Sequence, residues 1–133
     1  IFETRGNQDC HVILRGGKQP NYSAADVDAT CAVLKAAGLR EQVMIDVSHA
    51  NSSKQHQRQI TVAAEVAQRI AAGDARITGL MIESHLQEGR QDIVPGQPLA
   101  QGVSVTDACI SMAQTVPVLE GLAAAVRARR QKA

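Results

Sequence analysis

Aromatic side chains are almost absent from this sequence: its 133 residues include no Trp, one Phe and one Tyr. Alanine, valine, leucine and isoleucine must therefore supply nearly the whole hydrophobic core, and the length predicts one domain large enough to bury it. The formal net charge of +1 provides no electrostatic steering, so nucleic acid is not an expected partner. A basic cluster near the end is expected in the last turn of a helix, where it complements the helix dipole: Arg127, Arg129, Arg130 and Lys132.

Cysteine is scarce and unpatterned, because Cys10, Cys31 and Cys109 are an odd number with no CxxC spacing. We therefore expect reduced thiols in a cytoplasmic protein. No apolar run approaches the length of a membrane span, so a membrane is not an expected partner. The chain shows no signal peptide and begins at Ile1 in a stretch typical of a strand or hairpin, so we expect a piece of a longer protein.

Apolar stretches at four places predict short strands, at about 11–14, 43–47, 77–82 and 105–107. Helical patterns follow the first two strands, from Ser23 to Gly38 and from about Ser53 to Ala72, and a closing helix is expected from about Thr115. Leu86 to Ser104 has no periodicity, which predicts a long loop that is functional or mobile.

The expected helices carry local signals of their own. Ser23 and Asp26 resemble a capping box, and Gly38 stands where a glycine ends a helix. Ser52 or Ser53 is the expected cap of the second helix. Two apolar faces are predicted to point inward: Val27, Cys31 and Leu34 on the first helix, and Ile60, Ala63, Ala64, Ala67 and Ile70 on the second.

This alternation of strands and helices predicts an α/β fold. Each strand-plus-helix unit has about 30 residues, the size of one unit in a (β/α)8 barrel, and four such units make half a barrel. We expect residues 1–133 to form a single domain of this kind, a partial TIM barrel. A doubly wound open sheet has the same alternation, although no GxGxxG turn marks a dinucleotide site.

Four polar residues follow the expected strands: Arg15, His49, Glu83 and Asp107. The carboxyl ends of all strands in a parallel barrel lie on one face, so these side chains are expected to lie near one another. One His and two carboxylates suit a divalent metal such as Mn, Fe, Co or Zn, and the fork of an arginine suits a phosphate. Asp46, inside an apolar strand, predicts a buried hydrogen bond or support of a ligand. The residues alone leave open a structural hydrogen-bonding role for the His and a capping or solvated role for the carboxylates.

Four strings of this sequence closely resemble the carboxyl-terminal part of the feedback-regulated microbial 3-deoxy-D-arabino-heptulosonate 7-phosphate (DAHP) synthases: 6–18, 43–54, 81–86 and 105–110. The likeness is nearly collinear over the whole chain. It implies strands five to eight of a (β/α)8 barrel and a transferase that condenses phosphoenolpyruvate with erythrose 4-phosphate and releases phosphate. That reaction opens the shikimate pathway to aromatic amino acids.

The resemblance also implies roles for individual residues. Arg15 is similar to the arginine that holds the phosphoenolpyruvate phosphate, and His49, Glu83 and Asp107 are similar to three of four metal ligands. Arg15 and His49 are thus the implied catalytic residues, and Arg15 and Asp107 the implied substrate-binding residues. The fourth metal ligand of such enzymes is a cysteine on the first strand, and neither Cys10 nor Cys109 is in the corresponding place.

Two other functions remain as alternatives. One is the related synthase that condenses phosphoenolpyruvate with arabinose 5-phosphate, although the strings 48–54 and 83–85 favour the heptulosonate enzyme. The other is a catalytically inactive fragment, since the family's first four strands are missing from this sequence. Half a barrel would leave unpaired strand edges, so we expect a homo-oligomer or association with an amino-terminal half.

Overall fold

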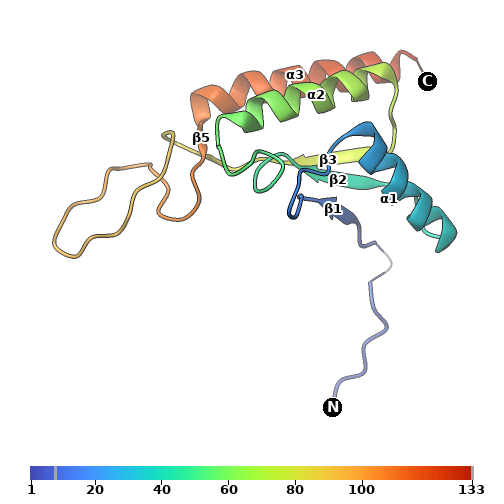
Figure 1. Ribbon diagram of the computed structural model, residues 1–133, viewed down its shortest axis with the longest axis horizontal. Helices are drawn as coiled ribbons and strands as arrows, with labels where there is room; N and C mark the ends of the chain where they lie inside the picture. The colour runs from blue at the N-terminus through green and yellow to red at the C-terminus, as the bar shows by residue number, and fades with distance from the viewer. Residues whose placement is uncertain (8, 133) are drawn as a thin grey trace.

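The computed structural model describes residues 1–7 and 9–132. Its elements alternate along the chain as an α/β fold (Figure 1), in the order β1 (Val12–Leu14), α1 (Ala24–Ala36), β2 (Val43–Asp46), α2 (Arg58–Ala72), β3 (Ile77–Met81), β4 (Ser84–His85), β5 (Ile110–Ser111) and α3 (Met112–Arg130). No helix in this part of the chain is long and apolar enough to cross a membrane.

Three parallel strands form the main sheet, in the order β1-β2-β3. Val12, Ile13 and Leu14 lie opposite Val43, Met44 and Ile45, and Ile45 in turn lies opposite Leu80. The expected first three strands are therefore confirmed. Because the strands are parallel, their carboxyl ends lie at one end of the sheet.

One apolar core joins the sheet to the helices. Val43, Ile45 and Val47 are fully buried, and they pack in one cluster with residues from all three helices. The predicted inward face of α1 is confirmed by the burial of Val27, Cys31 and Leu34. Aliphatic residues supply this core, as the scarcity of aromatic residues requires.

The boundaries of α1 follow its local signals. Ser23 Oγ accepts a hydrogen bond from the Asp26 amide, and the Asp26 carboxylate accepts one from the Ser23 amide at 2.9 Å, which completes the capping box. Gly38 follows the end of the helix with φ of +69°, a left-handed conformation that glycine adopts without a steric penalty.

The second helix begins later than predicted, at Arg58 and not near Ser53. Ser53 and Lys54 adopt positive φ angles of 54° and 59°, which continue a tight turn and cannot belong to a right-handed helix. Gln57 occupies the cap position and makes no side-chain capping bond. The prediction that Ser52 or Ser53 caps this helix is therefore wrong.

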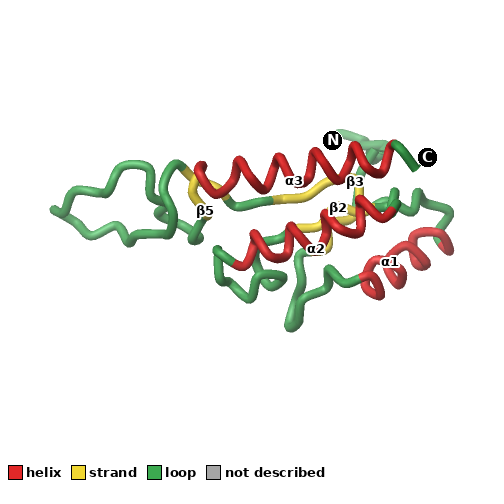
Figure 2. The backbone as a smooth tube through the Cα atoms, turned by 90° about the horizontal axis from the view of Figure 1, so that it is seen from above, coloured by secondary structure: helices red, strands yellow, loops and turns green. Residues whose placement is uncertain are grey.

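The predicted inward stripe of α2 was only partly correct. Its buried side is formed by Gln59, Val62, Ala63, Val66 and Ile70. By contrast, Ile60, Ala64 and Ala67 line a groove that α3 borders on its other side. The two helices lie side by side (Figures 1 and 2), so α2 has two contact faces where the pattern indicated one.

The fourth expected strand, at 105–107, is absent from the described residues. Val105 and Asp107 lie in an exposed bend, where no neighbouring strand pairs with them. The pairing takes place farther along the chain, where β5 lies parallel to β4. An extended backbone without a pairing partner leaves its amides and carbonyls to water and gains no ladder stabilisation. α3 follows at once, starting at Met112 and not near Thr115, because Ser111 and Gln114 form a second capping box.

The residues between β4 and β5 form one long excursion, as the lack of periodicity predicted. Figure 1 shows this segment extending away from the sheet and helices. Within it, Gly89 pairs with Cys109 and Arg90 pairs with Ser104, each as an isolated bridge. These bridges bring the end of the excursion back beside its beginning.

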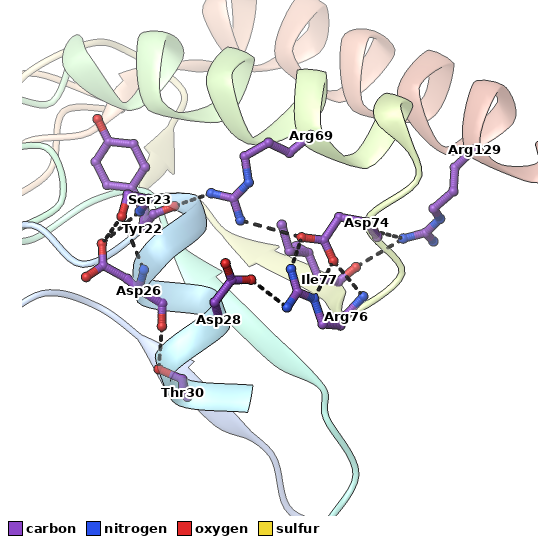
Figure 3. Close-up of polar contacts among 10 residues, drawn as sticks. All are labelled: Tyr22, Ser23, Asp26, Asp28, Thr30, Arg69, Asp74, Arg76, Ile77 and Arg129. Carbon is purple, nitrogen blue, oxygen red and sulfur yellow. Dashed lines mark hydrogen bonds and ion pairs between the residues drawn. The ribbon is translucent and has the colours of Figure 1, made fainter. Parts of the chain in front are cut away.

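A polar cluster at the amino ends of the strands ties the helices to the sheet (Figure 3). The Arg76 guanidinium hydrogen-bonds Asp74 and lies 2.7 Å from Asp28 on α1. The hydrogen bonds from Arg76 to Asp74 hold the pKa of Asp74 below its usual range, although burial opposes the shift. Arg69 donates to the Tyr22 carbonyl, and Arg129 of the expected basic last turn donates to the carbonyls of Asp74 and Ile77. The contacts of Arg76 and Arg129 thus hold the end of the sheet opposite the strand carboxyl ends through charge-assisted hydrogen bonds.

Candidate metal and phosphate site

A cavity of about 400 Å³ opens at the carboxyl ends of the main strands. Its lining combines two glycines with cationic, imidazole and carboxylate groups: Arg15, Gly16, Gly17, His49, Ala50, Ser52, Lys54, His56, Glu83, Asp107 and Ala108. All four side chains that the sequence singled out, Arg15, His49, Glu83 and Asp107, are among them.

Different elements deliver these residues. Arg15 directly follows β1, His49 is three residues beyond β2, and Glu83 is two residues beyond β3. Asp107 arrives from the excursion between β4 and β5 and not from the end of a strand. His49, Glu83 and Asp107 nevertheless each offer a ligand atom, and these atoms all lie within 4.8 Å of one another.

The His49 ring is oriented by a buried carboxylate. Its Nδ1 lies 2.6 Å from Asp46 Oδ2, and Asp46 is fully buried at the end of β2. Asp46 Oδ1 accepts hydrogen bonds from both the amide and the hydroxyl of Ser48, at 2.8 and 2.5 Å. A proton on Nδ1, donated to Asp46, leaves Nε2 with a free lone pair, and this atom lies 3.6 Å from Glu83 Oε1. The buried hydrogen bond predicted for Asp46 is present.

Electrostatics around Glu83 suit a cation. Burial raises the pKa of Glu83. A positive charge on His49 would lower this pKa, whereas the carboxylates of Asp107 and Asp46 raise it further. Three carboxylates gathered around one imidazole repel one another. A divalent cation among them attracts each carboxylate and so offsets this repulsion. The donor set of one imidazole nitrogen and two carboxylates fits Mn, Fe, Co or Zn.

Close packing of two loops places Arg15 beside the His49 loop. Gly16 has φ of +74°, and a Cβ there would lie 2.7 Å from the Ala50 Cβ, so only glycine fits. Arg15 is exposed, and both Arg15 and Lys54 line the cavity. Two cationic side chains on the wall of one cavity are suited to an anionic ligand such as a phosphate.

Sequence reasoning missed several residues of this region. Lys54, the last residue of the string 43–54, lines the cavity, and so does His56, which no sequence pattern indicates. Glu88, in the excursion, accepts a hydrogen bond from Gln114 of α3 and lies 2.8 Å from His56 Nε2. These contacts fasten the excursion that carries Asp107 to the beginnings of α2 and α3.

Comparison with known proteins identifies relatives of this chain. The family model described as the DAHP synthetase I family matches residues 2–120. The Phe-sensitive phospho-2-dehydro-3-deoxyheptonate aldolase of Escherichia coli strain K12 is 57% identical over 130 residues, which cover 98% of this chain and 37% of that protein. The tyrosine-inhibited enzyme of that name from Schizosaccharomyces pombe is 55% identical over 136 residues, with 98% of this chain and 37% of that protein covered.

A solved structure is also similar. The phospho-2-dehydro-3-deoxyheptonate aldolase of Francisella tularensis SCHU S4 superposes with a TM-score of 0.92 at 50% sequence identity, covering 96% of this chain and 37% of that one. This α/β chain with a parallel sheet belongs to the DAHP synthetase I family. It spans 37% of the length of the E. coli relative.

Proposed function

We propose that this chain forms part of a DAHP synthase, which joins phosphoenolpyruvate to erythrose 4-phosphate and releases phosphate at the entry to aromatic amino acid biosynthesis. The observation that carries the proposal is that one cavity brings the ligand atoms of His49, Glu83 and Asp107 within 4.8 Å of one another and is also lined by Arg15. Membership of the DAHP synthetase I family supports the same reaction. The cysteine usage supports a cytoplasmic location for it.

In this proposal the reaction forms a bond between C3 of phosphoenolpyruvate and the aldehyde carbon of the sugar. Water adds at C2 of the pyruvyl unit, and phosphate leaves with cleavage of its C–O bond. His49, Glu83 and Asp107 would hold a divalent metal, which would supply Lewis-acid stabilisation of the negative charge on the aldehyde oxygen. His49 and Arg15 are then the catalytic residues.

The roles of the side chains follow from their surroundings. Arg15 binds the phosphate of phosphoenolpyruvate through its planar, two-pronged guanidinium and holds it until it leaves. His49 would offer Nε2 to a metal, because Asp46 occupies its Nδ1. Asp107 would contribute a carboxylate to the metal, and the resemblance to DAHP synthases implies that it also lies near the sugar phosphate.

The decisive experiment is a chimera in which this chain replaces the matched 130-residue segment of the E. coli aldolase. We expect the chimera to release phosphate from phosphoenolpyruvate in the presence of erythrose 4-phosphate. The 133-residue chain alone should release none above background, because the family's fourth metal ligand and its other phosphate-binding cations are missing. Two phosphorylated substrates bring more negative charge than Arg15 and a loosely held metal neutralise.

The same assay separates the two aldose substrates. Arabinose 5-phosphate is one carbon longer than erythrose 4-phosphate, and a difference of that size is worth about tenfold or more in kcat/KM. A chimera that prefers arabinose 5-phosphate would contradict the proposal, as would turnover by the 133-residue chain alone. The parent E. coli enzyme, assayed in parallel, provides the reference rate.

We also propose that the chain forms one domain, strands five to eight of a (β/α)8 barrel, and that it requires a cover for its sheet. Among the described residues, β1 and β3 each pair with β2 alone in the main sheet. The face away from the core carries Ile13, which is 44% exposed, and the half-buried Met44 and Met81. An exposed apolar sheet face with open edges associates with whatever covers it.

We therefore expect the isolated chain to form a homo-oligomer at micromolar concentration. A second copy would then cover the sheet face that an amino-terminal half would otherwise cover. Burying about a few hundred Å² of apolar surface contributes several kcal/mol at about 25 cal/mol per Å². Light scattering during size-exclusion chromatography measures the mass. Ile13→Lys should shift the chain toward monomer, whereas Val33→Lys, on an exposed position of α1, should not. A well-folded monomer of the unmodified chain would contradict this expectation.

A further inference from the structure

Two buried amide side chains near the cavity have no assigned role. Asn51 is fully buried, and Gln59 is 1% exposed. A buried amide destabilises a protein unless its polar atoms are hydrogen-bonded, so the partners of these groups indicate what they hold together. In both cases the partners are backbone groups beside the site residues.

Asn51 connects the ends of β1 and β2. Its Nδ2 donates to the carbonyls of Leu14, at 3.0 Å, and of Asp46, at 2.7 Å. These are the last residues of the two strands, so the amide joins the chain just before Arg15 to the chain just before His49.

The other end of the Asn51 amide reaches the loop after Arg15. Asn51 Oδ1 accepts a hydrogen bond from the Asn21 amide at 2.8 Å, and Asn21 Oδ1 accepts one from the Gly16 amide at 2.7 Å. A continuous series of hydrogen bonds therefore runs from the β2 end, through Asn51 and Asn21, to the residue after Arg15.

Gln59 makes an equivalent connection to the third site-bearing segment. Its Oε1 accepts a hydrogen bond from the Glu83 amide at 2.8 Å, and its Nε2 donates to the Glu83 carbonyl at 3.2 Å. Pairing of both backbone groups of one residue is what a neighbouring strand provides in a sheet. The Gln59 side chain provides it beyond the end of β3, where the ladder with β2 has ended.

We propose that Asn51 and Gln59 are positioning residues that set the spacing of the site: Asn51 fixes Arg15 relative to His49, and Gln59 fixes Glu83 relative to both. The inference rests on the ligand roles that the proposed function gives to Arg15, His49 and Glu83. Neither amide lines the cavity, so each acts through the backbone of a residue that does.

The bonding pattern predicts a different consequence for each substitution. Gln59→Met keeps the length of the side chain but removes both bonds to Glu83, so it should affect the metal alone. Asn21→Ala releases the Gly16 amide and should affect the anion bound at Arg15 alone. Asn51→Ala frees the ends of both strands and should affect the metal and the anion together.

The experiment uses the chimera described above, in which the site is complete, with Mn²⁺ alone and inorganic phosphate alone. Electron paramagnetic resonance of free Mn²⁺ measures the metal affinity, and calorimetry measures the phosphate affinity. Gln59→Met should weaken Mn²⁺ binding about tenfold, the usual cost of losing an orienting partner, and leave phosphate binding unchanged. Asn21→Ala should show the converse, and Asn51→Ala should weaken both. Gln68→Met and Asn7→Ala, at exposed positions, are the matched controls.

Thermal unfolding shows which variants remain folded, and if Asn51→Ala does not, Gln59→Met and Asn21→Ala still test the inference through their opposite selectivity. Equal losses of both affinities in these two variants would indicate general loosening and would overturn it, as would unchanged affinities in both. An unmodified chimera that binds neither probe would instead contradict the ligand roles themselves.

Discussion

Replacing His49 by alanine in the chimera is expected to remove bound metal and activity together. The substitution deletes one of three side-chain donors in this chain whose ligand atoms lie within 4.8 Å of one another. It leaves Glu83 and Asp107 as two carboxylates with no imidazole between them. Loss of an outer partner of a metal ligand already costs about 10–100-fold in affinity, and loss of the ligand itself should cost more.

Elemental analysis of the purified variant, alongside phosphate release from phosphoenolpyruvate, measures both effects. His11→Ala is the matched control, because His11 is an exposed histidine just before β1 and does not line the cavity. Metal content equal to that of the unmodified chimera would remove His49 from the ligand set. Loss of activity with full metal content would assign His49 a role other than metal binding.

Replacing Arg15 by lysine is expected to weaken the use of phosphoenolpyruvate far more than that of erythrose 4-phosphate. Lysine keeps the positive charge but loses the planar fork that binds two phosphate oxygens at once. Loss of such a charge-assisted, two-pronged contact costs about 2–3 kcal/mol. That free energy corresponds to a decrease of about 30–150-fold in kcat/KM for phosphoenolpyruvate.

Steady-state kinetics with each substrate varied in turn distinguish the two effects. Arg40→Lys serves as the control, since Arg40 is exposed and lies before β2, away from the strand carboxyl ends. An unchanged KM and kcat for phosphoenolpyruvate in Arg15→Lys would contradict the assignment. Equal losses for both substrates would show that Arg15 contributes to the general field of the cavity and does not bind one particular phosphate.

Local patterns determined much of the fold. The apolar run at 43–47, the capping box at Ser23 and the glycine at 38 depend on neighbouring residues, and the structure has β2 and α1 there. The gathering of Arg15, His49 and Glu83 in one cavity also followed from the sequence, because parallel strands carry their carboxyl ends to one side. The resemblance to DAHP synthases is carried by strings of residues and depends on no tertiary contact.

Long-range contacts decided the rest. Asp107 reaches the cavity through an excursion held by isolated bridges and by Glu88, because no strand at 105–107 finds a neighbour. Asn51 and Gln59 look like ordinary polar residues in sequence, and only their burial against the backbone at Leu14 and Glu83 shows what they hold. Sequence periodicity records which side of an element is apolar, whereas a hydrogen bond between residues far apart in the chain exists only once the fold brings them together.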